Sequence, residues 1–419
     1  MKPIGLKRGY RTPFVKMGKE YGRLNAVDLS VRLINGMLEK RDVPAEQIQH
    51  VVWGMVVPEP NIYSIAREAV LGSHLDKRVE AYSVSRACAT SLQAAANAAS
   101  YYNVFPEQSS ITLVGGIESF SAARPVLTDQ ASLLVKTLAS RAPISQKLKA
   151  FFRTPLSAYW PVPPSAKEYS TGLTMGEHCE LMVKEFKIAR ERQDRFALAS
   201  HQKATAARPK IAPQLISVVQ GVAQDTLIRH DTSMEALKGL PPAFDRSPAG
   251  TITAGNASPF TDGAAALYVI SPALETTVAP DAFLADFEFV AVDPKTGLLM
   301  GPGKAMLRLL QRQNLRWGDL DYIEMHEAFA GQVLCNVDAV NNPSYREKAY
   351  GLSYDAGHLD ENRINPWGSS IAYGHPFGAT GARMLNQAIA YLHDTHTKRA
   401  FIGICTAGAL AGAALVVRN

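Results

Sequence analysis

The chain has 419 residues, with 44 Lys and Arg against 38 Asp and Glu. Hydrophobic residues make up 47% and charged residues 20%, a balance that excludes a wholly disordered or fibrous chain. At roughly 150 residues per domain we expect about two to three domains. The net charge of +6 is spread along the chain, so it suits an anionic ligand but does not indicate nucleic-acid binding.

Four cysteines are scattered along the sequence: Cys88, Cys179, Cys335 and Cys405. They form no CxxC pair, which argues against a disulfide framework and against a cysteine-based zinc site. A reducing, intracellular compartment is the simplest interpretation. We find no segment of membrane-spanning character and no signal-peptide pattern, so we expect a cytoplasmic protein of bacterial type or one whose presequence has been removed.

Two stretches near the ends of the chain share a pattern. Residues 34–54 and 306–326 each read as the end of an amphipathic helix, a connection and a β-branched strand. The hydrophobic positions correspond at a constant offset, with Leu38 matching Leu310 and Val51 matching Ile323. Such patterns are common in α/β proteins, but together they predict two similar α/β halves, one at each end of the chain.

Cys88 stands between a predicted strand, residues 81–85, and a helix that begins in the segment RACATS. The N-terminus of a helix offers free N–H groups and a partial positive charge, which lower a thiol pKa and favour the thiolate. The alternative is a cysteine that only packs as a small hydrophobe. The small, polar neighbours of Cys88 favour a nucleophile.

Two other features have simpler interpretations. Gly115 and Gly116 in LVGGIESFS predict the tight end of a strand. Cys179 and Cys335 lie on helical patterns without polar neighbours, so we expect both to be structural.

Residues 123–259 differ from the rest of the chain and carry charged helical patterns, such as residues 189–207. We interpret them as an inserted surface domain. Residues 129–155 mix Leu, Val and Phe with basic side chains. These are Lys136, Arg141, Lys147, Lys149 and Arg153. A solvated amphipathic helical hairpin is the simpler interpretation, and a docking surface for a partner or a membrane is the alternative.

His326 closes the predicted strand YIEMH and precedes Glu327, Ala328 and Phe329. The ends of strands in open α/β sheets are where functional groups gather. An HExxH zinc motif is absent, because Ala330 stands where its second histidine would be.

His375 lies in GHPFGATGAR, between glycines and before a second helix rich in small residues. Glycine-rich backbone lets a ligand or another chain segment come close. A histidine in a turn is usually structural, but one at such a helix start can act as a base or an oxyanion donor. Because this helix and the one after Cys88 carry almost no charge, we expect both to be buried between sheets.

Cys405 ends the apolar strand FIGIC and opens TAGALAG. A packing role is the usual one for a cysteine in an apolar strand. The small residues that follow predict a turn whose N–H groups could face a ligand.

Four motifs in this order and spacing, RACATS, HEAFAGQ, GHPFGATGAR and CTAGALAG, resemble the thiolase family. The resemblance extends over essentially the whole chain, because it includes RTPF at 11–14, GGIESFS at 115–121 and the segment 242–267. HEAF, YSTGLTMGE and the long basic insert are most similar to the 3-ketoacyl-CoA thiolase β-subunit of the fatty-acid oxidation trifunctional complex.

The resemblance implies the thiolase fold, with two similar α/β halves in α-β-α-β-α layers and an inserted loop domain. The N-terminal half would span residues 1–122 and be completed by about 260–281. The loop domain would be 123–259 and the C-terminal half 282–419.

The resemblance also implies the activity of an acetyl-CoA C-acyltransferase. Such an enzyme cleaves 3-ketoacyl-CoA with CoA, giving acetyl-CoA and a shortened acyl-CoA in fatty-acid β-oxidation, by a ping-pong route through an acyl-Cys88 thioester. His375 would accept the thiol proton and help hold the thioester oxygen, and Cys405 would be the second acid/base. No metal and no permanently bound cofactor is implied, since CoA is a substrate.

Further roles are implied for residues around these three. His326 would orient a water in one oxyanion hole, and the backbone N–H groups of Cys88 and Ala407 would form the other. Ser258 would lie against the pantetheine arm of CoA, with Met175 as a further substrate contact. The resemblance implies a homodimer or higher homo-oligomer, with a hydratase/dehydrogenase α-subunit and peripheral membrane contact as further partners.

One departure from the family pattern concerns the C-terminal motif, where Ala409 and Ala411 replace glycines. If those positions need a positive φ, alanine costs about 1 kcal/mol or more there. This puts the acyl specificity and the second oxyanion hole in question, but removes no reactive side chain.

Three alternatives differ in class. A ketoacyl synthase shares the fold, but the second cysteine, Cys405, argues against it. A biosynthetic acetoacetyl-CoA thiolase has the same catalytic groups, and HEAF and the long insert argue against that. A non-catalytic thiolase-like CoA-binding subunit is opposed by the intact Cys88, His375 and Cys405.

Overall fold

Strands from both ends of the chain form the framework of the molecule. The computed structural model describes residues 1–162, 167–219 and 221–419. The strands are β1 (Ile4–Arg11), β2 (Val15–Lys16), β3 (Ile48–Gly54), β4 (Glu80–Val84), β5 (Ile111–Glu118), β6 (Thr261–Ile270), β7 (Ala282–Ala291), β8 (Tyr322–Met325), β9 (Arg399–Thr406) and β10 (Leu410–Val417).

Helices cover and separate these strands. They are α1 (Ala26–Lys40), α2 (Ile65–Gly72), α3 (Thr90–Val104), α4 (Asp129–Ala139), α5 (Ile144–Arg153), α6 (Met175–Glu185), α7 (Arg190–Ile211), α8 (Met234–Lys238), α9 (Gly301–Gln313), α10 (Ala330–Asn341), α11 (Pro343–Tyr345), α12 (Ser370–Tyr373) and α13 (Thr380–Asp394).

The strands follow one hydrogen-bonded path, β4-β3-β5-β6-β1-β7-β10-β9-β8, with β2 beside β6. Its two halves repeat one arrangement, in which a parallel pair (β3 with β5, β8 with β9) is followed by an antiparallel neighbour (β6, β10). The halves meet where β1 pairs with β7 through Ile4–Leu284, Gly5–Phe283 and Leu6–Ala282. This repetition agrees with the two similar halves expected from the sequence.

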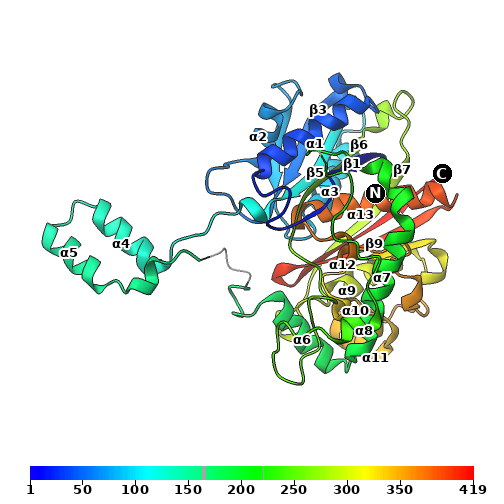
Figure 1. Cartoon of the computed structure of the whole chain (residues 1–419). Coiled ribbons are helices and arrows are strands. Elements are labelled where there is room, and N and C mark those ends of the chain that lie inside the picture. The colour runs from blue at the N-terminus through cyan, green and yellow to red at the C-terminus, as the bar shows by residue number, and fades with distance from the viewer. Residues whose placement is uncertain (163–166, 220) are drawn as a thin grey trace.

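Helices α3 and α13 pack against each other between the two halves, and α13 contacts strands of both. On the outer faces, α1 and α2 cover the N-terminal strands and α9 covers the C-terminal strands (Figure 1). The layers therefore run α-β-α-β-α, as the resemblance implies. In the part of the chain that the structure describes, none of the helices has the length and apolar character needed to cross a bilayer.

The repeated sequence pattern corresponds to a repeated structure. Leu38 lies in α1 and Leu310 in α9, and each helix leads through a short 3-10 turn to a strand, β3 or β8. Val51 and Ile323 are both buried in those strands. The prediction made from the spacing is confirmed.

Gly115 and Gly116 do not form a strand end, so that prediction is wrong. Both lie inside β5. A Cβ on Gly116 would lie 2.0 Å from the backbone oxygen of Gly378, and one on Gly115 would lie 2.4 Å from the Trp53 ring. Glycine is needed here because a loop and an indole pack directly against the strand.

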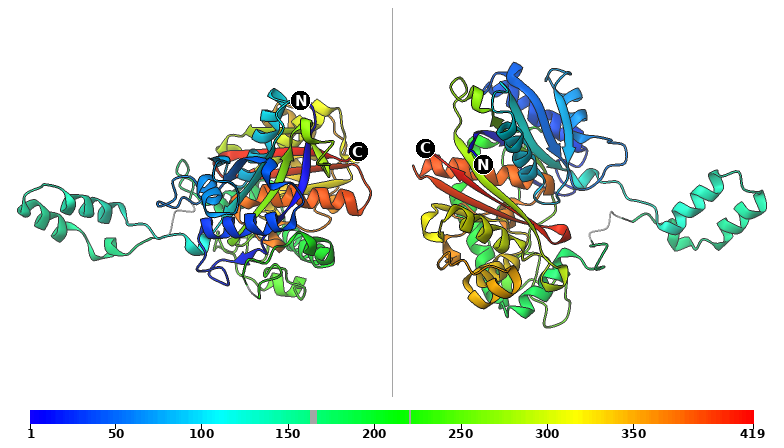
Figure 2. Two further views of the ribbon diagram at one scale, coloured as in Figure 1. Left: turned by 90° about the horizontal axis from the view of Figure 1, so that it is seen from above. Right: turned by 180° about the vertical axis from the view of Figure 1, so that it is seen from behind.

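The insert has two structurally different parts. Residues 124–162, hereafter the arm, form a helical hairpin of α4 and α5 whose ends are joined by an antiparallel bridge between Val126 and Val162. Figure 1 and Figure 2 show the arm standing away from the layered body in every view. Helices α6 and α7, by contrast, pack on α10, and α7 also contacts α12. The domain boundaries at residues 122, 259 and 281 remain predictions.

The two central helices approach closely at a glycine, which yields a test of the fold. A Cβ on Gly381 of α13 would lie 2.5 Å from the backbone nitrogen of Leu92 in α3. We expect Gly381→Ala to destabilise the protein by about 1–3 kcal/mol, although alanine is the better helix former. Gly318→Ala is the matched control, because a Cβ added at Gly318 would meet no atom of the described residues within 4 Å. Chemical unfolding that gives both variants the same stability would contradict this packing.

Candidate active site

Cys88 is presented by a sharp turn between β4 and α3. Ala87 has a φ of 43°, in the left-handed region that alanine rarely adopts. The Thr90 hydroxyl stabilises the turn, accepting from the Arg86 N–H at 2.8 Å and donating to the Ala87 carbonyl at 2.7 Å. The turn places Cys88 directly before Ala89, the N-cap residue of α3, so the cysteine stands at the helix start as the sequence predicts.

The thiol of Cys88 faces His375, with 3.1 Å between Sγ and Nε2. The other ring nitrogen, Nδ1, lies 2.7 Å from the Thr380 hydroxyl oxygen. Because Thr380 donates its own hydrogen to the Pro376 carbonyl, it accepts from Nδ1–H. The lone pair of Nε2 is therefore directed at the thiol, where it can take the proton.

Burial determines the charge state of this pair. Burial raises the pKa of Cys88 to about 12. The N–H groups of Ala407 and of Cys88 itself oppose the change, and the nearby Glu118 adds a smaller effect in the same direction as burial. Burial, helped by the charge of Arg383, lowers the pKa of His375 to about 3. The expectation of a lowered thiol pKa is wrong, because desolvation outweighs the helix terminus. The resting pair is a neutral thiol beside a neutral imidazole.

His326 follows β8 directly, and its backbone N–H donates to the Gly403 carbonyl at 2.8 Å. Its ring centroid lies 4.1 Å from that of His375. Burial, followed by the charges of His375 and Arg383, lowers its pKa well below the usual range. Its Nε2 is buried and has no hydrogen-bond partner among the described residues.

The structure brings Cys88, His326 and His375 together, with one ligand-type atom of each within 4.8 Å of the others. Two imidazole nitrogens and a thiolate are a donor set that zinc accepts. A metal ion here would displace the thiol proton and occupy the nucleophile. The absence of a metal from the chemistry remains a prediction.

Cys405 lies at the buried end of β9, near Cys88 and the HEAF segment. Burial raises its pKa well above the usual value, the charge of Cys88 adds to this, and the Ala328 backbone opposes it. The turn that follows contains Ala407, whose backbone hydrogen-bonds to the Cys88 sulfur. The second cysteine and the Ala407 N–H thus approach the nucleophile from the C-terminal half.

The two alanines that replace family glycines differ in conformation. Ala409 has a φ of 57°, so its left-handed backbone costs about 1 kcal/mol or more relative to glycine. Ala411 lies in the regular part of β10. The doubt raised by the sequence therefore applies to Ala409 alone.

The expected substrate contacts lie in different surroundings. Ser258 is half-buried beside the HEAF segment, where its N–H and its hydroxyl donate to the Ala328 carbonyl at 2.9 and 3.1 Å. Met175 is the first residue of α6 and packs, half-buried, against the core of the C-terminal half. Cys179 and Cys335 are fully buried free thiols, which agrees with the structural role expected for both.

Glu118 is a neighbour of the His375 loop that the sequence reasoning missed. Its carboxyl accepts from the N–H groups of Val57 at 3.0 Å, Val56 at 3.2 Å and Gly378 at 3.2 Å. It thereby ties the His375 loop to the connection after β3. Burial raises its pKa to about 8. An acid at the end of an otherwise apolar strand is the signal that could have identified it.

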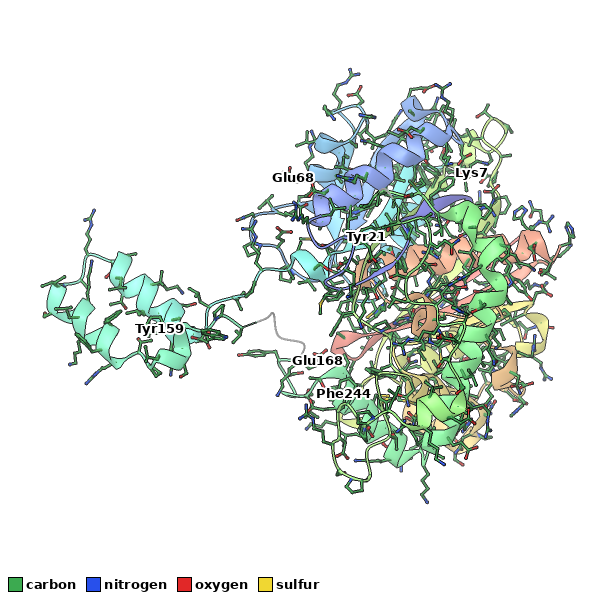
Figure 3. All side chains as sticks on the ribbon, in the orientation of Figure 1. Lys7, Tyr21, Glu68, Tyr159, Glu168 and Phe244 are labelled. Carbon is green, nitrogen blue, oxygen red and sulfur yellow. The ribbon has the colours of Figure 1, made fainter. Side chains whose placement is uncertain are left out.

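A second missed contact comes from the insert. The Glu168 carboxylate accepts from the backbone N–H of Gly408 at 2.7 Å, next to Ala407. Figure 3 shows Glu168 on the segment that returns from the arm to the body. No sequence signal links these residues, because they lie far apart in the chain.

The charge state of Cys88 predicts its reactivity. Since its pKa is raised to about 12, the thiolate fraction should rise about tenfold per pH unit across the range near neutrality. We therefore expect the rate of Cys88 alkylation by iodoacetamide to climb steadily between about pH 7 and pH 10. Peptide mass spectrometry distinguishes Cys88 from the buried cysteines. A plateau already at neutral pH would mean that the resting enzyme holds a thiolate–imidazolium pair.

Comparison with known proteins places this geometry in context. Two family models match, "Thiolase, N-terminal domain" over residues 6–273 and "Thiolase, C-terminal domain" over residues 278–419. Curated 3-ketoacyl-CoA thiolases of Escherichia coli strains 55989 and K12 (MC4100/BW2952) are each 38% identical over 423 aligned positions, covering 99% of this chain and 96% of the relative. The crystal structure of the Bacillus anthracis acetyl-CoA acetyltransferase matches with a TM-score of 0.81 and 25% identity, covering 100% of this chain and 99% of the other.

Proposed function

The chain belongs to the thiolase family, and from that premise we propose that it is a 3-ketoacyl-CoA thiolase, an acetyl-CoA C-acyltransferase of fatty-acid β-oxidation. The observation that carries the proposal is the Cys88 thiol 3.1 Å from the basic nitrogen of His375, with Cys405 buried nearby. Its substrates are 3-ketoacyl-CoA and CoA.

In the first half-reaction, Nε2 of His375 takes the thiol proton while Sγ of Cys88 attacks the 3-keto carbon. The carbon–carbon bond between C2 and C3 then breaks, leaving the shortened acyl group on Cys88 as a thioester. The electron pair of the broken bond forms the enolate of acetyl-CoA, which Cys405 protonates. A neutral resting thiol suits this step, because the charge appears only as the base removes the proton.

In the second half-reaction, free CoA replaces acetyl-CoA. Cys405, left as a thiolate, takes the proton of the CoA thiol, and the CoA sulfur attacks the acyl-Cys88 carbonyl. Collapse of the tetrahedral intermediate releases the shortened acyl-CoA, and His375 returns its proton to Cys88. Both cysteines end as they began, so the cycle needs no external acid, base or oxidant.

Each half-reaction develops a negative oxygen that needs hydrogen-bond donors. We assign the N–H groups of Cys88 and Ala407 to the oxygen of the Cys88 adduct, supported by the Ala407 backbone contact to the thiol. We assign His326 to orient a water that donates to the thioester oxygen of the acetyl-CoA part, and His375 to help hold the same oxygen. Ser258 and Met175 are proposed to contact the CoA arm.

A thiolysis assay with 3-ketoacyl-CoA substrates of increasing chain length tests the function. We expect Cys405→Ala to lower kcat by about 10²–10⁴-fold, the usual contribution of a positioned acid or base. Cys335→Ala is the matched control, a buried cysteine outside the site, and should retain the wild-type rate. Near-wild-type turnover of Cys405→Ala would reduce Cys405 to a packing residue. Activity on the four-carbon substrate alone would favour the acetoacetyl-CoA thiolase.

We also propose that the arm docks a second protein. Large apolar side chains are exposed along it, namely Leu133, Val135, Leu138, Ile144, Leu148, Phe151, Phe152, Leu156 and Trp160. All ten residues of α5 are exposed or half-buried. Exposed apolar side chains in this number on one small element favour a binding surface.

The position of the arm relative to the active site supports a partner that supplies the substrate. On the outgoing side, the Phe120 ring contacts Phe377 at 4.8 Å between centroids, and Phe377 contacts His375 at 4.7 Å. On the returning side, Glu168 binds the Gly408 N–H. Both roots of the arm thus adjoin the catalytic groups. We propose a hydratase/dehydrogenase subunit that delivers 3-ketoacyl-CoA, with the basic side chains of the arm adding attraction to an acidic partner or membrane.

Paired substitutions test this docking role. Phe152 and Trp160 are 79% and 80% exposed, so Phe152→Ser with Trp160→Ser should leave the fold and the thiolysis of free substrate nearly intact. We expect the variant to lose co-purification with the partner from its own cells. Leu181→Ser, an exposed apolar residue outside the arm, is the control. Persistence of the complex, or a wild-type protein found only as a homo-oligomer, would contradict the proposal.

Thiolase family members commonly form oligomers, and we propose that this chain forms a homodimer or a higher homo-oligomer. The cytoplasmic location favoured by the sequence remains a prediction.

A further inference from the structure

The active site contains two neutral imidazoles in contact. The reaction needs each ring to carry its single proton on a different nitrogen. His375 must accept a proton at Nε2, whereas a donor to a developing oxyanion must carry one there. We propose that Ser370, held by Arg383, fixes His326 with its proton on Nε2, the reverse of His375. The inference deepens the proposed function, on which it rests, and makes Ser370 and Arg383 positioning residues.

The hydrogen of the Ser370 hydroxyl determines the tautomer of His326. Oγ of Ser370 lies 2.9 Å from Nδ1 of His326 and 3.0 Å from Nη2 of Arg383. A guanidinium can only donate, so Ser370 accepts from Arg383. Its own hydrogen then needs an acceptor, and Nδ1 of His326 is the one that the described contacts provide. Nδ1 is therefore unprotonated, and the single ring proton of neutral His326 lies on Nε2.

The partner of His375 gives the opposite result by the same reasoning. The Thr380 hydroxyl donates to the Pro376 carbonyl at 3.1 Å, which leaves it an acceptor toward the ring. His375 therefore carries its proton on Nδ1 and exposes a lone pair at Nε2. The Thr380 hydroxyl also bonds to a carbonyl, and the Ser370 hydroxyl also bonds to a guanidinium. This difference makes one histidine a base and the other a hydrogen-bond donor.

A buried network prevents Arg383 from leaving this position. Its guanidinium forms an ion pair with Glu324, and the two side chains are 1% and 0% exposed. Ser369 accepts from Arg383 at 3.1 Å and donates to Glu324 at 2.7 Å. Tyr322 donates to the same carboxylate at 2.5 Å. Because arginine stays protonated in proteins, Ser370 always accepts from Arg383. Its hydroxyl therefore keeps donating to Nδ1 of His326.

The consequence appears on the other side of the His326 ring. Nε2 is buried and has no partner among the described residues, although buried polar atoms are nearly always hydrogen-bonded. An N–H held there is a donor prepared for a substrate oxygen or an ordered water. The charge of Arg383 also helps to keep both rings neutral, since it contributes to the lowered pKa of each.

Nitrogen NMR of the complete enzyme, selectively labelled with ¹⁵N-histidine, tests the assignment directly. His326 and His375 are identified by the signals lost in His326→Asn and His375→Asn. We expect a protonated-type shift for Nε2 of His326 and for Nδ1 of His375. Protonation of His326 on Nδ1 in the wild type would overturn the inference, whether or not the enzyme is a thiolase.

Two adjacent serines provide the matched variants. Ser370→Ala should allow His326 to populate the Nδ1–H form and lower kcat by about tenfold or more, with a much smaller change in KM. Ser369→Ala also removes a hydroxyl beside Arg383 but no contact to His326, so it should leave the His326 shifts unchanged. Unchanged His326 shifts in Ser370→Ala would contradict the inference. Wild-type protein without thiolysis activity would count against the proposed function and leave the NMR result intact.

Discussion

The close packing of α3 against α13 is the constraint on which the active site depends. Cys88 directly precedes Ala89, the N-cap residue of α3, and His375 lies shortly before α13. The distance between their reactive atoms is therefore set by how the two buried helices meet. Gly381 lets the helix backbones approach, and Gly378 lets the His375 loop lie against β3 and β5. A base and a nucleophile from opposite ends of the chain are thereby held at hydrogen-bond distance before substrate arrives, which is the preorganisation that catalysis requires.

Burial has a second effect, on charge. It disfavours the thiolate of Cys88 and keeps both imidazoles neutral. Hydrogen bonds must therefore determine which histidine acts as a base and which as a donor. The hydroxyls of Thr380 and Ser370 provide that selectivity, one backed by a carbonyl and the other by the Arg383–Glu324 pair. The ion pair lies behind the site and contributes through the orientation of a neighbour.

Much of this organisation could be predicted from local sequence. The repeat around Leu38 and Leu310, the helix start at Cys88 and the glycine-bounded His375 each reflect patterns within a few residues. The pKa of Cys88 could not be predicted, because it depends on the depth of burial. The role of Gly116 depends on a loop more than two hundred residues away. The histidine tautomers depend on the hydrogen bonds that the Thr380 and Ser370 hydroxyls make to other groups. Ala409 was identified as a problem by sequence, but only the fold shows that its φ is positive.

The central claim is that Cys88 carries the acyl group between the two half-reactions. Incubation with a 3-ketoacyl-CoA in the absence of free CoA, followed by acid quenching and peptide mass spectrometry, measures this directly. We expect the shortened acyl mass on the peptide that contains Cys88, and its disappearance when CoA is added. Acyl mass only on the Cys405 peptide, or turnover without any acylated peptide, would contradict the account.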